Sequence, residues 1–229
     1  MGLISSRLRS VIPTMSIEEK IRVLAAEYAK KLEDSISKRV EDMKTDDKSH
    51  YLIYRVLGIT IAEGELIDIY QNKGRFLYNR AGNFLEKAAI LCFQEKHPDA
   101  ESTKIPNTSG QRPKTFQIDC LINKDAIEIK WRDATTDGDH ITKEHSRLQA
   151  TKEGGYKPIR IMFYYPNRAQ AMRIQQTLET LYAGMDGEYY FGDSAWEYIH
   201  QRTDIDLKNI LEKIANENTK ENRHQSLAR

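Results

Sequence analysis

The stretch from Phe116 to Ala134, FQIDCLINKDAIEIKWRDA, constrains the fold of this chain more than any other part. Apolar residues alternate with polar ones in two short runs, which is the pattern of two half-buried β-strands joined by a turn. Because successive side chains point to opposite faces of a strand, Glu128 and Lys130 share one face of the second strand. Asp119 lies on the polar face of the first. The stretch therefore predicts a β-hairpin that brings three charged side chains close together.

The length of the turn decides whether Asp119 meets Glu128. A turn of two residues, Asn123-Lys124, or of four, Ile122 to Asp125, pairs position 119 with position 128, whereas a three-residue turn pairs it with Ile129. We expect an even-numbered turn, because only then do the apolar residues of both strands share one face. These residues are Ile118, Cys120, Ile127 and Ile129.

In that register, the carboxylates of Asp119 and Glu128 predict a metal site. Two carboxylates ~5 Å apart raise each other's pKa unless a cation lies between them. Their hard oxygen atoms suit Mg²⁺, which keeps some water ligands and accepts a substrate phosphate. Lys130, beside them, is placed to orient or deprotonate a metal-bound water, and this chemistry hydrolyses phosphodiesters. The alternative is a solvated ladder of ion pairs with no catalytic role.

Two capping boxes mark the starts of long helices before the hairpin. Ser16 with Glu19 opens an amphipathic helix that continues to Met43, and Thr60 with Glu63 opens another. The other segments predicted around the hairpin, in chain order, are the remainder of that second helix to residue 74, a third helix over 81–96, a loop over 102–114, a helix over 141–154, a buried strand over 158–165, a helix over 166–182, and two short helices over 194–202 and 207–216.

Composition limits the class of protein. Of the 229 residues, 39% are hydrophobic and 30% are charged, which is enough for a packed core. The longest apolar run, Ala88 to Phe93, is far shorter than the ~20 residues of a membrane helix. The two cysteines, Cys92 and Cys120, fall in predicted buried segments, which is typical of reduced thiols in the cytoplasm. We therefore expect a cytoplasmic mixed α/β protein with a helical N-terminal flank.

The spacing of Asp119, eight residues, then Glu128-Ile129-Lys130 resembles the motif of the PD-(D/E)XK nucleases. Ile118 stands where the family name has proline, which weakens the match to the motif more than the mechanism. The segments KGRFLY, EIKWRDATTDGDHITKEH and FYYPNRAQA resemble the ApaLI-like group of type II restriction endonucleases. The resemblance covers about residues 82–180. It implies an α/β fold with a restriction-endonuclease-like core, in which helices flank a mixed β-sheet with a catalytic β-hairpin, plus helical N-terminal and C-terminal segments.

The resemblance also implies a role for each matching residue. Asp119 and Glu128 would bind Mg²⁺, together with the carbonyl oxygen of Ile129, and Lys130 would be the catalytic lysine. Many members of the family add a glutamate from the preceding helix, and Glu86 is at the matching position. The alternative for Glu86 is an ordinary solvent-facing position on that helix.

Basic segments predict where a nucleic acid would lie. Lys143 and Arg147 are one helical turn apart, a spacing that presents both to one phosphate track. Residues 73–80 interleave basic and aromatic side chains, and residues 104–114 carry side chains of the types that read base edges. The alternative for each segment is a solvated surface or packing in the core. The residues predicted to contact DNA are Arg75, Tyr78, Arg80, Lys104, Arg112, Lys114, Arg132, His140, Lys143 and Arg147.

Together these features predict a Mg²⁺-dependent type II restriction endonuclease that cuts a short palindromic site in double-stranded DNA. The resemblance implies that it leaves 5′-phosphate and 3′-hydroxyl ends. Because the two strands of the DNA are antiparallel, we expect a homodimer with one active site for each strand. Because the host's own DNA must be protected, we also expect a cognate DNA methyltransferase. The alternatives are a DNA-repair or Holliday-junction nuclease of the same fold, and a non-catalytic DNA-binding protein. The predicted division is an N-terminal helical segment for DNA contact or dimerisation over 1–75, a catalytic core over 76–185, C-terminal helices over 186–217, and a flexible tail over 218–229.

Overall fold

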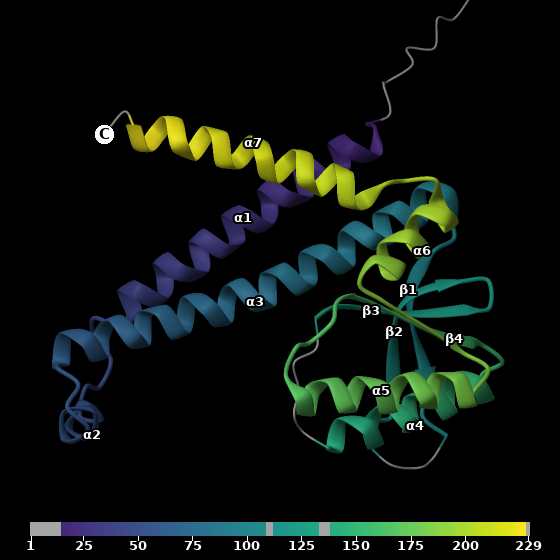
Figure 1. Ribbon diagram of the computed structural model, residues 1–229, viewed down its shortest axis with the longest axis horizontal. Helices are drawn as coiled ribbons and strands as arrows, with labels where there is room; N and C mark the ends of the chain where they lie inside the picture. The colour runs from purple at the N-terminus through teal and green to yellow at the C-terminus, as the bar shows by residue number, and fades with distance from the viewer. Residues whose placement is uncertain (1–14, 109–111, 133–137, 228–229) are drawn as a thin grey trace, which may run out of the picture.

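A five-stranded mixed β-sheet lies at one end of the molecule, where helices surround it (Figure 1). The computed structural model describes residues 15–108, 112–132 and 138–227. The strands lie in the order β1-β2-β3-β4-β5, in which β1 to β3 are antiparallel and β3 to β5 are parallel. They are β1 (Glu101–Pro106), β2 (Thr115–Ile122), β3 (Asp125–Arg132), β4 (Lys157–Tyr164) and β5 (Glu188–Phe191). The predicted α/β fold is confirmed, and the sheet is compatible with a restriction-endonuclease-like core.

Helices cover both faces of this sheet (Figure 1). On one face, Leu85 of α3 and Ile199 of α6 join Ile127 and Ile161 of the sheet in the main hydrophobic core. On the other face lie α4 and α5, where Ala150 of α4 belongs to a second apolar cluster. No helix in the described part of the chain is long and apolar enough to cross a membrane. The helices are α1 (Ile17–Asp42), α2 (Tyr51–Val56), α3 (Ile61–Lys96), α4 (Asp139–Glu153), α5 (Ala169–Gly184), α6 (Asp193–Thr203) and α7 (Leu207–Leu227).

The helices α1 and α3 form a long antiparallel pair that extends far beyond the sheet, with α2 at its far end (Figure 1). Residues 17–78 are referred to below as the arm. Both predicted capping boxes are present: the Ser16 hydroxyl accepts a hydrogen bond from the Glu19 N–H at 3.2 Å, and the Thr60 hydroxyl accepts one from the Glu63 N–H at 3.2 Å. These caps confirm the predicted starts of the two helices.

The helix α3 is uninterrupted over 36 residues, whereas the sequence pattern predicts two helices with a break after Gly74. That prediction is wrong because a glycine ends a helix by adopting a positive φ, and Gly74 does not adopt one. Packing against α1 outweighs the ~1 kcal/mol that a glycine costs inside a helix. Phe84 of α3, for example, packs its ring 6.0 Å from that of Tyr28. The boundary predicted at residue 75 therefore falls inside a continuous helix.

The strands at the two edges of the sheet differ from the prediction. Residues 101–106 form β1 and not a loop, because Ile105 is buried beside Phe116 of β2. Pro106 is tolerated there because it ends an edge strand, where a missing N–H costs little. At the other edge, β5 lies in the segment 186–217, for which the sequence predicts helices. The sheet therefore continues past the predicted core boundary at residue 185.

The hairpin of β2 and β3 has the predicted even-numbered turn. Its two residues are Asn123 and Lys124, and Cys120 pairs with Ile127. Asn123 adopts a φ of 54°, a region that asparagine tolerates better than most residues. Extending this register places position 119 opposite position 128, as predicted.

A β-bulge in β2 changes the direction of its side chains at positions 119 and 120. Between the pairs Glu101–Leu121 and Thr103–Ile118, β2 contains one residue more than β1. Before the bulge, Ile118 belongs to the apolar cluster on the α4 face; after it, Cys120 belongs to the main core on the α3 face. The prediction that Ile118 and Cys120 share one face is therefore wrong. Because of the extra residue, the side chains after the bulge point to the opposite faces of the sheet from those that regular alternation would give.

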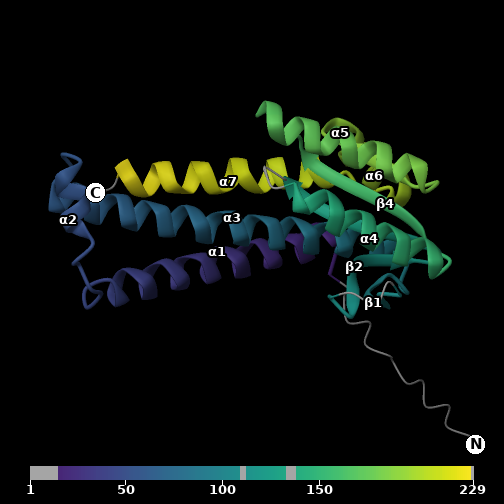
Figure 2. The ribbon, with the colours of Figure 1, turned by 90° about the horizontal axis from the view of Figure 1, so that it is seen from below.

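The helix α7 begins at the predicted position but extends to Leu227, through the segment that was predicted to be a flexible tail. Ile210 and Ile214 are buried in the main core. Arg22 of α1 donates a hydrogen bond to Glu217 at 3.0 Å, which ties α7 to the arm. Figure 2 shows α1, α3 and α7 extending away from the sheet on the same side. The N-terminal residues 1–14 lie outside the described part.

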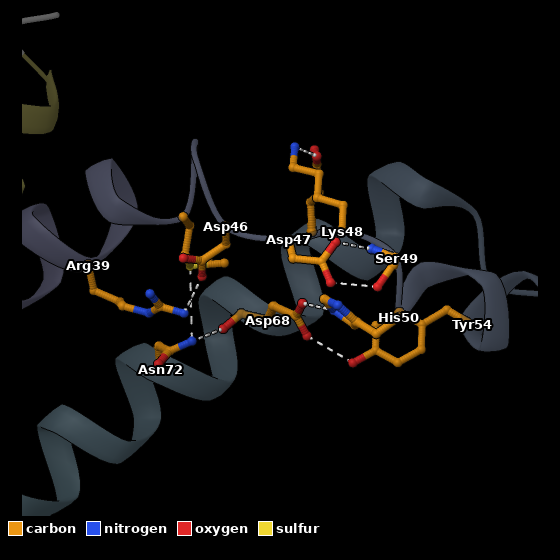
Figure 3. Close-up of polar contacts among 11 residues, drawn as sticks. Arg39, Asp46, Asp47, Lys48, Ser49, His50, Tyr54, Asp68 and Asn72 are labelled. Atoms are coloured by element: carbon orange, nitrogen blue, oxygen red, sulfur yellow. Dashed lines mark hydrogen bonds and ion pairs between the residues drawn. The ribbon is translucent and has the colours of Figure 1, made fainter.

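Polar contacts close the far end of the arm (Figure 3). Asp68 of α3 accepts a hydrogen bond from the Tyr54 hydroxyl at 3.0 Å and lies 3.2 Å from Nε2 of His50. Arg39 of α1 pairs with Asp46 at 2.6 Å. These contacts hold α2 and the connecting residues against both long helices.

Candidate active site

The candidate active site lies where β2 and β3 separate beyond their last paired residues. Oδ2 of Asp119 accepts a hydrogen bond from the backbone N–H of Ile129 at 2.8 Å, so the side chain of the bulge residue points toward β3. Nζ of Lys130 lies 2.5 Å from Oε1 of Glu128 and 4.0 Å from Oδ2 of Asp119. The structure thus brings together the three charged residues that the sequence pattern predicts.

Glu128 is the most enclosed carboxylate of this group, with 4% of its surface exposed. Burial alone would raise the pKa of Glu128, but the cations of Lys130 and Arg147 hold it well below its usual range. Both cations contact Oε1. Oε2 is buried and makes no hydrogen bond to any residue that the structure describes. A buried carboxylate oxygen without a donor is costly, so Oε2 is available to a ligand from outside the chain.

Asp119 is in the opposite electrostatic situation. Burial, followed by the negative charge of Glu128, raises the pKa of Asp119 above its usual range. Lys130 and the N–H of Ile129 lower this pKa but do not compensate for the first two causes. A cation between the two carboxylates would remove the repulsion.

Replacing Asp119 with asparagine is therefore expected to stabilise the metal-free protein at pH 8. For an acid whose pKa is raised by folding, stability falls as the pH rises from the unfolded value, ~3.9, through the folded value. The asparagine oxygen can still accept the hydrogen bond from Ile129. We expect the Tm in EDTA to rise by several degrees, since 1 kcal/mol corresponds to about 2–4 °C for a chain of this size.

Thermal unfolding followed by circular dichroism at pH 5 and pH 8 would test this expectation. The advantage of the variant should shrink at pH 5, where ionising Asp119 costs the wild type less. A variant that is less stable than the wild type at pH 8 would contradict it. Asp186→Asn, at an exposed aspartate that pairs with Lys152, is the control and should not raise the Tm.

The donors in this site fit a hard divalent cation. Asp119 and Glu128 offer carboxylate oxygens, and the carbonyl oxygen of Ile129 lies on the same strand segment. No group of three or more His, Cys, Asp or Glu side chains in the described residues is arranged as a metal site. Among the described residues, the hairpin offers the carboxylates of Asp119 and Glu128, and Mg²⁺ suits such a site because it keeps several water ligands and accepts substrate phosphates.

Behind the hairpin lies a buried charge network that connects α4, β4 and α5. Arg160, on β4 beside Glu128, is fully buried, and its NH1 lies 3.1 Å from Oε1 of Glu144. The same oxygen accepts a hydrogen bond from the Tyr182 hydroxyl at 2.7 Å. Arg147 reaches both carboxylates, with its NH1 in contact with Glu128 and 3.7 Å from Oε2 of Glu144. The network thus fixes Arg147 against the hairpin of β2 and β3.

Glu86 of α3 lies within electrostatic reach of this hairpin. Burial raises the pKa of Glu86; among the nearby charges, Lys130 lowers it and Glu128 raises it. Glu86 also contributes to the raised pKa of Asp119. Its side chain is half-buried, so the purely solvent-facing alternative is not what the structure shows.

The structure places the predicted DNA contacts in different environments. Arg80 turns toward α1, where its NH2 lies 3.1 Å from the Ser35 hydroxyl, and Arg147 points to Glu128 as described. Neither guanidinium is therefore on a surface phosphate track. His140 is half-buried at the start of α4. Exposed side chains are Arg75, Tyr78, Lys104, Arg112, Lys114, Arg132 and Lys143.

The sequence pattern does not predict two residues of the site, Glu144 and Arg160, and it predicts a DNA contact for Arg147. A signal was present for Arg160, because it interrupts the apolar run PIRIMFYY of a predicted buried strand. An arginine in such a run needs a buried anion. Glu144 and Arg147 are three residues apart on one helix, which looks like an ordinary surface pair until the sheet covers it.

Comparison with known proteins identifies the family. A family model described as ApaLI-like restriction endonuclease matches residues 11–216. No curated protein and no solved structure matches the chain. The matched range includes the arm, the candidate active site and the beginning of α7. Since it covers most of the sequence, the chain belongs to the ApaLI-like restriction endonuclease family, and it is a nuclease of the type II restriction class.

Proposed function

We propose that the chain hydrolyses phosphodiester bonds in double-stranded DNA at specific sites, with Mg²⁺ as its cofactor, and leaves 5′-phosphate and 3′-hydroxyl ends. One observation carries this proposal: Asp119, Glu128 and Lys130 lie together on the hairpin, and Oε2 of Glu128 is buried without a hydrogen bond to a described residue. This arrangement supports the PD-(D/E)XK mechanism that the motif implies.

Each residue of the hairpin has a distinct role in this proposal. Asp119, Glu128 and the carbonyl oxygen of Ile129 would hold the cation. When bound, Mg²⁺ neutralises charge on the phosphate and lowers the pKa of a bound water. Lys130 would orient the attacking water through its ammonium group, and in its neutral amine form it would accept the proton of that water. Glu86 adds negative charge beside the same site.

Digestion of a supercoiled plasmid of known sequence tests this function. We expect discrete linear fragments in Mg²⁺, no cleavage in EDTA, and recovery when Mg²⁺ is added in excess. Sequencing and religation of the fragments would map the cut and identify the 5′-phosphate. Cleavage at an undiminished rate in EDTA, or no cleavage in any divalent metal, would refute the proposal.

The exposed cations provide a path for the substrate. Arg75 and Arg132 lie near the candidate active site because Tyr78, one turn along α3 from Arg75, packs its ring 4.6 Å from that of Trp131. We propose that Arg132 and the exposed Lys104, Arg112, Lys114 and Lys143 contact phosphates, and that Arg75 also contacts the DNA. We also propose that the protein acts in the cytoplasm, where DNA would reach it, and that a cognate DNA methyltransferase protects host DNA.

We propose that the protein acts as a homodimer and that the apolar end of the arm contacts the second copy. Two antiparallel strands need two active sites related by two-fold symmetry. From Ile61 to Glu86, α3 rises about 37 Å, so arms meeting end to end would hold the two sites more than about 70 Å apart. Each arm must therefore lie along its partner. The large apolar residues exposed at this end, with 49–74% of their surface accessible, are Leu52, Ile53, Val56, Leu57, Ile61, Leu66, Ile67 and Tyr70.

Sedimentation equilibrium tests the dimer. We expect a mass of about twice 26.6 kDa for the wild type and one close to 26.6 kDa for the double variant Val56→Asp/Leu57→Asp. Tyr164→Asp, at an exposed residue of β4 outside the arm, is the control and should remain dimeric. A double variant that stays dimeric would place the interface elsewhere.

A further inference from the structure

Two glycines occur inside α3 where this chain does not need them. Gly74 and Gly82 both lie in the helix interior, and neither has a positive φ. A Cβ atom added to either would meet no atom within 4 Å. Glycine is one of the least favourable residues inside a helix, so side chains at these positions would be expected to stabilise α3. Glycine also allows another molecule to approach the helix backbone closely, which is one reason for a helix to contain it.

These glycines lie on a polar face of α3, which we call the recognition face. Its residues recur at intervals of three and four, which places them on one side of the helix. The same side continues into the catalytic half of α3, where Glu86 follows Gly82 by four residues. Leu77 and Phe84, by contrast, line the contact with α1. The recognition face consists of Gln71, Gly74, Arg75, Tyr78, Asn79 and Gly82.

Part of the recognition face forms a shallow, open depression beside the candidate active site. Gly74, Arg75, Tyr78 and Asn79 line a depression of about 490 Å³. Tyr78 connects this depression to the catalytic strand, because it packs on Trp131 and its hydroxyl donates a hydrogen bond to the carbonyl oxygen of Arg132 at 3.4 Å. A ligand in the active site would therefore continue onto this part of α3.

The charges and side-chain types of this face fit DNA. From residue 69 to residue 85, α3 carries three basic residues and no acidic one. Arginine pairs with guanine through two hydrogen bonds, and asparagine and glutamine pair with adenine in the same way, all at base edges in the major groove. Arg75, Asn79 and Gln71 provide these three side chains four residues apart, and all three are exposed.

We propose that the recognition face enters the major groove of the substrate and reads base edges through Gln71, Arg75 and Asn79. Gly74 and Gly82 let the helix backbone approach the bases. This inference rests on the proposed DNA cleavage and adds the residues that select the sequence. Measured along the axis of α3, Asn79 lies about 10 Å from Glu86 and Gln71 lies about 22 Å from it. At about 3.4 Å per base pair, the bases that these residues contact therefore lie within about seven base pairs of the cleaved bond.

Adding bulk at one glycine tests the approach of the helix. Gly74→Leu is expected to keep or raise the Tm, because it improves helix propensity without a clash, and to slow cleavage of the mapped plasmid site at least tenfold. Gly184→Leu, at an exposed glycine of α5 whose added Cβ also meets nothing, is the control and should cleave at the wild-type rate. Wild-type cleavage by Gly74→Leu, or loss of its fold, would overturn the inference.

Removing single polar groups tests the readout. Arg75→Ala and Asn79→Ala should each lower the preference for the correct base at one or two positions of the site by about 5- to 150-fold, and leave the other positions unchanged. Asn209→Ala, at an exposed asparagine of α7, is the matched control. The measurement is the relative cleavage of a plasmid set that carries every single-base change in the mapped site.

The outcomes separate this inference from the proposed function. If the wild type cuts no plasmid, the proposed function fails and the recognition face fails with it. If the wild type cuts one site and both alanine variants keep its full preference at every base, only the recognition face fails.

Discussion

Replacing Glu128 with glutamine is expected to slow DNA cleavage at least about a thousandfold while the protein stays folded. The substitution keeps the shape of the side chain but removes the anion that Lys130 and Arg147 neutralise. It also weakens the oxygen that we assign to the cation. A metal ion supplies several kcal/mol of charge stabilisation in the transition state, and each 1.4 kcal/mol changes the rate about tenfold.

Single-turnover cleavage of the mapped plasmid site is the measurement, together with duplex binding in metal-free buffer. Binding should persist, since removing a negative charge beside a phosphate does not weaken it. Lys130→Met should give a comparable loss of rate, because general acid–base groups contribute about 10²–10⁴-fold. Glu179→Gln, at an exposed glutamate of α5, is the matched control. Cleavage by Glu128→Gln within tenfold of the wild type would remove Glu128 from the mechanism.

Replacing Arg160 with methionine is expected to destabilise the protein by about 3–5 kcal/mol. Arg160 and Glu144 are 0% and 4% exposed in their side chains, and their charged atoms lie 3.1 Å apart. Without the guanidinium, Glu144 keeps a hydrogen bond from Tyr182 and a distant contact from Arg147. A buried carboxylate that has lost its partner is far more costly than the pair itself.

Thermal unfolding should show a decrease in Tm of roughly 10 °C for this variant. The double variant Arg160→Met/Glu144→Leu should recover much of the loss, since an apolar pair can replace a buried ion pair. Lys152→Met breaks an exposed pair with Asp186 and is the control, with an expected change below about 1 kcal/mol. If Arg160→Met melts within 2 °C of the wild type, the network does not support the hairpin.

The hairpin explains why a large part of the site is predictable from the sequence. Its alternation restricts β2 and β3 to an even-numbered turn, because a one-residue slip would turn every side chain to the wrong face. The turn Asn123-Lys124 has that length, and Asp119 and Glu128 meet as expected. Local patterns succeed here because both partners are close together in the chain.

The bulge at positions 119 and 120 is not predictable in this way. The bulge arises where β2 pairs with β1. The sequence of β1 by itself predicts a loop, because the residues that β1 buries depend on Phe116 and the rest of the sheet. The same holds for α3, where Gly74 ends the predicted helix but packing against α1 continues it. In both cases contacts between distant segments outweigh a local preference of ~1 kcal/mol.

The sequence by itself determined the hairpin, the capped starts of α1 and α3, and the three charged residues, because these depend on local spacing and side-chain chemistry. Only the tertiary structure decided that Arg147 faces Glu128 and not solvent, that Arg160 and Glu144 are buried together, and that α3 continues past the sheet with an exposed polar face. The physical reason is that a charge on a helix or strand has no fixed partner until the sheet and the second layer of helices close around it.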